Sequence, residues 1–184
     1  MIDEVISKMS SEPGFEGCQV KVIEPPRSTL HTIKTCRKLC HQNRCGSYGR
    51  SWGCPPALGK DDENLEYINH FRHAVLISHR FENVDMKDLE FIEKSAEQHQ
   101  DLCRRVANAI RKKGISDVLP VCSGACKYCG ECTYPDAPCK FPEQMVPSVS
   151  GFGIIMEDYL QSQNISFKFE DNAFTLYGLV LYRE

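Results

Sequence analysis

The residues best suited to chemistry are four cysteines in one short segment. They follow one another at C-x2-C-x2-C-x6-C, as Cys126, Cys129, Cys132 and Cys139. Three thiols at this spacing can surround three sides of a compact inorganic core, and the fourth closes the site. Bacterial ferredoxins use the same C-x2-C-x2-C run for three corners of a [4Fe–4S] cluster, whereas zinc sites more often consist of two separated C-x2-C pairs. The spacing favours a [4Fe–4S] cluster, with zinc or a redox dithiol as alternatives.

A second group of cysteines lies upstream with looser spacing. The pattern is C-x3-C-x4-C-x8-C, formed by Cys36, Cys40, Cys45 and Cys54. Pro55 and Pro56 fix the backbone after the last cysteine in an extended form. Gly46 and Gly49 allow the chain to turn tightly around a core. We interpret this group as a second metal site on a loop, the alternative being a loop with free thiols.

Both loops resemble those of a prokaryotic family described as predicted metal-binding proteins. The first matches a YG-x-x-W-x-CPP pattern through Tyr48, Gly49, Trp52, Cys54, Pro55 and Pro56. The second matches C-x2-C-x2-C followed by PC-x-x-P and PS-x-x-x-x-GI, which ends at Gly153 and Ile154. The resemblance implies metal binding, of the iron–sulfur kind, and names no reaction. Many relatives have an acidic residue and an alanine where this chain has Ser150 and Gly151.

Bulk properties fit a small intracellular redox protein. A length of 184 residues predicts one domain over residues 1–184, with cysteine loops at 36–56 and 122–142. The odd count of 11 cysteines argues against full disulfide pairing. The N-terminus has no signal-peptide pattern, and no apolar run is long enough for a membrane span. We therefore expect a cytoplasmic protein without a membrane partner.

Charge is unevenly distributed along the chain. The net charge of −3 gives no general attraction to nucleic acid. Basic residues nevertheless surround the first cysteine loop, namely Lys34, Arg37, Lys38, His41, Arg44 and Arg50. Such cations would stabilise an anionic four-thiolate cluster. The alternative is that they dock an acidic partner or an anionic substrate.

Helices and strands are expected to alternate around the two loops. Hydrophobic periodicity predicts strands over residues 18–25, 73–81 and 116–122, and helices over 64–71, 85–113 and 155–163. A C-terminal hairpin is expected from residues 165–170 and 175–184, turning at Asp171 and Asn172. The strand–helix–strand order predicts parallel neighbours, and both cysteine loops follow segments that approach the same side of the sheet. The expected fold is therefore α/β, a single domain with a mixed sheet flanked by helices.

The remaining cysteines and histidines form no ligand pattern along the sequence. Cys103 falls on the apolar stripe of the long predicted helix and is interpreted as core. Cys18 opens a strand and is also interpreted as structural. Cys122 ends a strand four residues before Cys126, so it is either a strand-end thiol or a competing ligand. His41 alone stands among the first set of thiols.

These observations predict a cytoplasmic protein with two [4Fe–4S] clusters that exchanges electrons with a partner protein. Each set of four cysteines would hold one cluster. The first alternative is an enzyme in which one cluster keeps an open iron site for substrate, with Cys122, His41 or Arg50 nearby. The second is a binding module stapled by zinc without a redox role. The sequence does not decide whether the protein is an enzyme.

Overall fold

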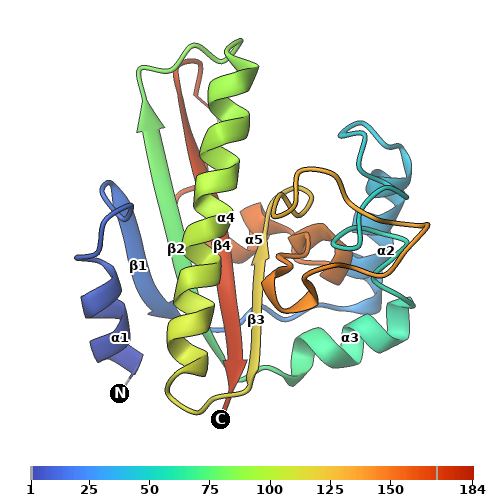
Figure 1. The fold of residues 1–184 in the computed structure, drawn as a ribbon, viewed down its shortest axis with the longest axis horizontal. Coiled ribbons are helices and arrows are strands. Elements are labelled where there is room, and N and C mark those ends of the chain that lie inside the picture. The colour runs from blue at the N-terminus through green and yellow to red at the C-terminus, as the bar shows by residue number, and fades with distance from the viewer. Residues whose placement is uncertain (1, 169) are drawn as a thin grey trace.

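The computed structural model describes residues 2–168 and 170–184. Within these residues the chain forms a four-stranded sheet in the order β1-β2-β4-β3 (Figure 1). The strands are β1 (Cys18–Ile23), β2 (His73–Glu82), β3 (Asp117–Cys122) and β4 (Ala173–Arg183). The helices are α1 (Ile2–Met9), α2 (Leu30–His41), α3 (Asp61–His70), α4 (Leu89–Arg111) and α5 (Met156–Ser162), with 3-10 turns η1 (Pro142–Gln144) and η2 (Val149–Phe152). None of these helices is both long and apolar enough to cross a membrane.

The long helix α4 lies along one face of the sheet (Figure 1). It begins after Asp88, whose carboxylate accepts a hydrogen bond from the N–H of Phe91 at 3.0 Å. Its buried apolar side chains recur every three or four residues and face the sheet and α1, as Leu102, Cys103, Val106, Ala107 and Ile110. This packing holds the polar residues of α4 in a fixed position relative to the end of β3.

The opposite face of the sheet carries the segment that follows the second cysteine loop. Leu119 of β3 and Leu179 of β4 pack there against Phe152 of η2. Gly153 ends η2 with φ of 70°, and a Cβ atom there would lie 2.6 Å from the backbone nitrogen of Ile33 in α2. Only glycine permits this approach. Helix α2, which carries two cysteines, is therefore held directly against this segment.

The strand pairing differs from the mixed sheet with parallel neighbours that the sequence predicts. The α/β class is confirmed, and the crossover through α4 does leave β2 and β3 running in the same direction. However, β4 lies between them and pairs antiparallel with both, while β1 pairs antiparallel with β2. Each neighbouring pair in the sheet is therefore antiparallel. Crossover rules give the relative direction of β2 and β3 but not the strand that enters between them.

The predicted C-terminal hairpin is wrong. Residues 165–168 and 170 have no regular secondary structure, and residue 169 of the predicted first strand lies outside the described residues. The alternation in this segment reflects packing, because Ile165 and Phe167 contact the core on the second face. The ring of Phe167 lies 5.9 Å from that of Tyr177. Strand β4 pairs with β2 and β3, and not with the segment before it as a hairpin would require.

Candidate metal centre

The first two cysteines of the upstream group lie on a helix and not on a loop as predicted. Helix α2 begins with a capping box in which Thr29 and Thr32 each donate a backbone N–H to the other's hydroxyl, at 3.0 and 3.1 Å. Cys36 and Cys40 are four residues apart, so they share one helical face. The T-x-x-T motif before C-x3-C is the sequence signal that indicates this arrangement.

The other two cysteines of this group lie beyond α2. Cys45 is exposed, whereas Cys54 is buried. Burial, followed by the charges of Cys45 and Cys40, raises the pKa of Cys54 to about 12. Burial and then Cys40 raise the pKa of Cys36 to about 11. Each thiol therefore lies within electrostatic reach of another, and keeping such thiols ionised requires a compensating cation.

The second cysteine loop starts where β3 ends and is anchored by a buried glutamine of α4. Gln100 is 1% exposed. Its Nε2 donates to the carbonyl of Ala125 at 2.8 Å, and its Oε1 accepts from the N–H of Lys127 at 2.9 Å. These two bonds fix the backbone on both sides of Cys126. The pKa of Cys129 is raised by burial and then by the nearby thiols of Cys132, Cys126 and Cys139. The four predicted ligands of this loop therefore lie close enough to interact electrostatically.

The two cysteine loops pack directly on each other. The N–H of Trp52 donates to Cys132 Sγ at 3.4 Å, and its indole Nε1 donates to the carbonyl of Ala137 at 3.0 Å. The rings of Trp52 and Tyr134 meet edge to face at 4.9 Å. At Gly53, an added Cβ would lie 3.2 Å from the Cβ of Cys126. The two cysteine groups therefore form one continuous region beside the edge strand β3 (Figure 1).

The basic residues near the first loop fall into two kinds. Arg37 is a structural residue, because it donates to the carbonyls of Gly59 and Gly151 at 2.6 and 3.4 Å and pairs with Asp61 at 3.1 Å. The others expected to surround the cysteines are exposed, namely Lys34, Lys38, His41, Arg44 and Arg50. His41 rests against the ring of Tyr48 at 5.2 Å. Cations therefore lie on the outer surface of this region.

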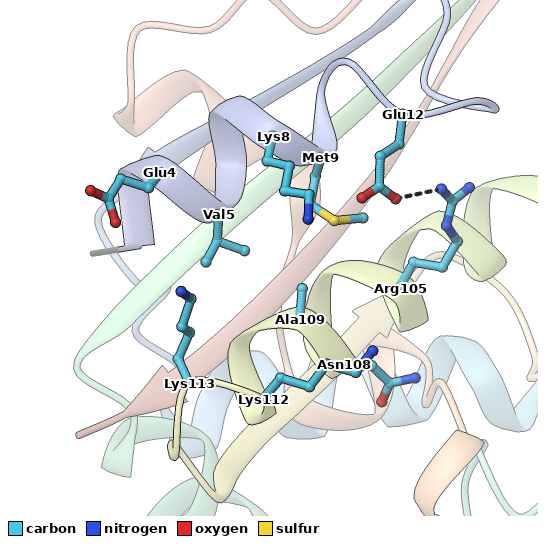
Figure 2. Close-up of a pocket in the computed structure, with 10 residues that line it drawn as sticks. All are labelled: Glu4, Val5, Lys8, Met9, Glu12, Arg105, Asn108, Ala109, Lys112 and Lys113. Atoms are coloured by element: carbon cyan, nitrogen blue, oxygen red, sulfur yellow. Dashed lines mark hydrogen bonds and ion pairs between the residues drawn. The ribbon is translucent and has the colours of Figure 1, made fainter.

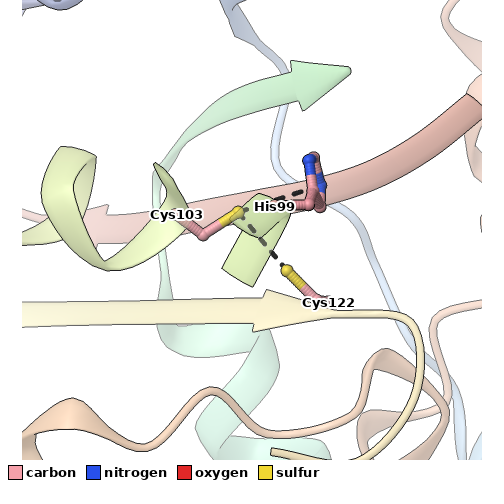
Figure 3. Close-up of side chains that lie close together, drawn as sticks. All are labelled: His99, Cys103 and Cys122. Carbon is pink, nitrogen blue, oxygen red and sulfur yellow. Dashed lines mark hydrogen bonds between the residues drawn. The ribbon is translucent and has the colours of Figure 1, made fainter. Parts of the chain in front are cut away.

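A third group of ligand-type side chains lies on the buried face of α4, as Figure 3 shows for His99, Cys103 and Cys122. One ligand atom from each residue lies within 4.8 Å of the other two. The sequence interpretation of Cys103 as a core residue agrees with its burial, and Cys122 is buried away from the solvent-facing part of the second loop. The sequence signal for this group is H-x3-C on a buried helical stripe, with a cysteine ending the next strand.

A separate groove lies between α1 and α4 (Figure 2), and α1 is on the opposite side of the molecule from the cysteine loops (Figure 1). Its lining includes Lys8, Lys112 and the ion pair between Glu12 and Arg105, at 2.9 Å. Neither cysteine nor histidine lines it. In the described residues, the clustered cysteine and histidine ligands therefore lie at the cysteine loops and between the middle of α4 and the end of β3.

Removing the amide anchor of the second loop is expected to destabilise the protein. Gln100→Met keeps the length of the side chain but leaves the Ala125 carbonyl and the Lys127 N–H without their partner. The free energy of unfolding should fall by about 1–3 kcal/mol. Urea denaturation of the metal-loaded protein measures it, with Gln98→Met on the exposed face of α4 as the control. Equal stability of the two variants would mean that the loop is not held by Gln100.

The donor groups define a cysteine-rich metal-binding protein. The family described as predicted metal-binding proteins (DUF2284) matches residues 26–182, which include both cysteine groups and the third cluster. The chain belongs to this family. No curated protein and no solved structure shows significant similarity to it.

Proposed function

We propose that the protein is a cytoplasmic electron carrier with two [4Fe–4S] clusters. One cluster would be held by Cys36, Cys40, Cys45 and Cys54, and the other by Cys126, Cys129, Cys132 and Cys139. The observation that carries the proposal is the direct contact between the two groups through Trp52, whose backbone N–H donates to Cys132 Sγ at 3.4 Å. Two redox centres that share a boundary are arranged for electron exchange with each other.

The spread of the donor atoms supports clusters over single ions. Sulfur ligands of one tetrahedral Zn²⁺ lie about 3.8 Å apart at the usual Zn–S distance. Among the described residues, the ligand atoms that approach within 4.8 Å of one another in a set of three belong to His99, Cys103 and Cys122, and not to either loop. Within the described residues, no three thiols of either loop approach one another as closely as the ligands of a preformed zinc site. A [4Fe–4S] cluster, which takes four thiolates at four corners, fits that donor set.

The protein residues around the loops would tune the redox potential. When bound, a cluster of this kind supplies one-electron redox chemistry. The N–H of Trp52 stabilises negative charge on Cys132 Sγ, which favours the reduced state. Cys54, at 6% exposure, is more shielded from water than the exposed Cys45. Solvent access and hydrogen bonds to sulfur both act on the potential, so the two sites are expected to differ in it.

The outer surface of the first loop is suited to an acidic redox partner. Lys34, Lys38, Arg44 and Arg50 are exposed there, and none of them forms an ion pair within the described part of the chain. Leu39 lies on α2 together with Lys34 and Lys38, and it is 59% exposed. Positive charge around an apolar side chain steers an acidic surface into contact. None of the 11 cysteines forms a disulfide, which fits the reducing cytoplasm.

The test is a combined measurement of composition and spin coupling. Anaerobically prepared protein should be brown and contain about eight iron atoms and eight sulfides per chain. After full reduction, electron paramagnetic resonance should give broadened, interacting spectra. A variant that retains one cluster, Cys129→Ser, is the matched control and should give a sharp signal. Colourless protein with zinc in both loops would contradict the proposal, and two sharp independent signals in the wild type would contradict electron exchange between the sites.

A polar cavity between the loops favours an enzyme as the second candidate. Its volume is about 480 Å³, and Arg50, Lys127, Cys126 and Cys132 contribute to its lining. The acidic side chains of Glu93, Glu97 and Glu131 also line it. A small polar molecule could bind there beside the cysteines. An enzyme of this kind would have a cluster that loses one iron atom on mild oxidation, because the iron at an open corner has no thiolate to retain it. The spectrum of that cluster would also change when a substrate is added.

A further inference from the structure

The group formed by His99, Cys103 and Cys122 has the dimensions of a mononuclear metal site. Cys103 Sγ lies 3.3 Å from Cys122 Sγ and 4.0 Å from His99 Nε2. Around a tetrahedral Zn²⁺ with ordinary bond lengths, two sulfurs are separated by about 3.8 Å and a sulfur and a nitrogen by about 3.6 Å. The observed separations lie within about 0.5 Å of both values. Small side-chain adjustments would therefore bring all three atoms into contact with one ion.

Strand β4 passes this group at Gly178, where any side chain would occupy the space between the three donor atoms. A Cβ added at Gly178 of β4 would lie 2.4 Å from Cys103 Sγ, 2.8 Å from Cys122 Sγ and 3.0 Å from His99 Nε2. The three donor atoms therefore converge on the position of a missing side chain. Gly178 does not have a positive φ, so backbone conformation does not explain it. The glycine at this position is explained by the space that the three ligand side chains need.

The imidazole of His99 is buried without a strong hydrogen bond. The residue is 2% exposed, and its Nδ1 has no hydrogen-bond partner in the described part of the chain. Its other nitrogen has only the sulfur at 4.0 Å. A buried polar group left in this condition costs about 1–3 kcal/mol. A metal ion bound at Nε2, the nitrogen that faces the two sulfurs, would replace this long sulfur contact with a coordinate bond.

We propose that His99, Cys103 and Cys122 bind a structural Zn²⁺ ion that fixes α4 to the end of β3. Nitrogen and thiolate donors together are the usual ligands of structural zinc, and such sites are closed by protein ligands. Cys18 of β1 packs against the same core cluster as Cys103 and Cys122, which makes it the candidate for the fourth position. The site is separate from the two cluster-binding loops. It clamps the scaffold directly before the second loop begins.

The inference is tested by metal analysis and native mass spectrometry of anaerobically purified protein. The wild type should contain about one zinc ion per chain. Cys103→Ala should lose that zinc and keep its iron. Gly178→Ala, which removes no ligand but places a methyl group among them, should lose it too. Val106→Ala is the control, since it also truncates the buried face of α4 and should retain zinc.

Three outcomes would overturn the inference. They are wild-type protein without zinc even after incubation with Zn²⁺, zinc that persists in both Cys103→Ala and Gly178→Ala, or a chain two hydrogens lighter from a disulfide between Cys103 and Cys122. If Cys103→Ala does not fold, Gly178→Ala and the wild-type mass still decide. Zinc in the loops would instead be lost in Cys129→Ser and kept in Cys103→Ala. Failure of the cluster proposal is therefore distinguishable from failure of this one.

Discussion

Cys129→Ser is expected to remove about four iron atoms per chain, the content of one complete cluster. Cys129 is the middle cysteine of the C-x2-C-x2-C run, and its thiol interacts electrostatically with Cys132, Cys126 and Cys139. Serine has nearly the same shape as cysteine, but its hydroxyl is a much poorer ligand for iron than a thiolate. No spare thiol in the second loop can replace it, because Cys122 faces Cys103 at 3.3 Å on the buried side of β3.

Iron and sulfide assays on anaerobically purified protein measure this effect. Cys18→Ser is the matched control, since it makes the same exchange on β1, outside both loops, and should keep its full iron content. The Cys129→Ser protein should still fold, because the sheet and α4 form their cores without the loop. An unchanged iron content in Cys129→Ser would show that this thiol is not a ligand.

The elements with strong local patterns could be predicted from the sequence. The strand over residues 73–81 is observed as β2, where Val75 and Ile77 are fully buried. The long helix that the sequence predicts over residues 85–113 is observed as α4, because its apolar stripe and its start near Asp88 are both local features. The strand over 116–122 is observed as β3, with Pro120 tolerated because β3 is an edge strand.

The features that depend on distant contacts could not be predicted in the same way. The position of β4 between β2 and β3 is set by which strands bury each other, and no local pattern encodes it. Helix α2 was missed because Cys36 and Cys40 were interpreted as loop ligands, although their spacing of four also fits a helical face. The cluster at His99 was missed because its members lie on separate elements, so only the fold brings Cys122 to Cys103.

The order of the elements predicts that the two cysteine groups lie near each other, but not that they are in direct contact. The sequence predicts that both loops leave one side of a sheet. The structure instead joins them through single residues, with Trp52 against Cys132 and Gly53 against Cys126. A tryptophan beside a cysteine motif could equally have been a core residue. Its two hydrogen bonds across the loops, at 3.4 and 3.0 Å, give it a role in the interface.

Removal of the metal is expected to unfold both cysteine loops while the sheet and α4 persist. The loop segments 43–56 and 123–141 contain no α-helix or strand. Two bonds from Gln100, the ion pair of Lys127 with Glu93 and the guanidinium of Arg104 over the Tyr128 ring join the second loop to α4. The first loop is joined to the segment after the second by the bond from the N–H of Ser148 to the carbonyl of Gly53 at 2.8 Å. Most of the free energy that orders them must therefore come from metal binding, as in domains that fold only when loaded.

Hydrogen–deuterium exchange on the loaded and the stripped protein measures this directly. Amides in 43–56 and 123–141 should exchange at nearly the unfolded rate after stripping, whereas those of β2 and β4 should stay protected. Burial raises the pKa of Cys36 and of Cys54, so these two thiols are neutral at pH 7 in the stripped protein and do not repel each other. The loops are expected to unfold because the sulfur–metal bonds are lost. Equal protection of the loops in both states would instead mean that Gln100 and Trp52 hold them, and that the metal binds to a site that is already formed.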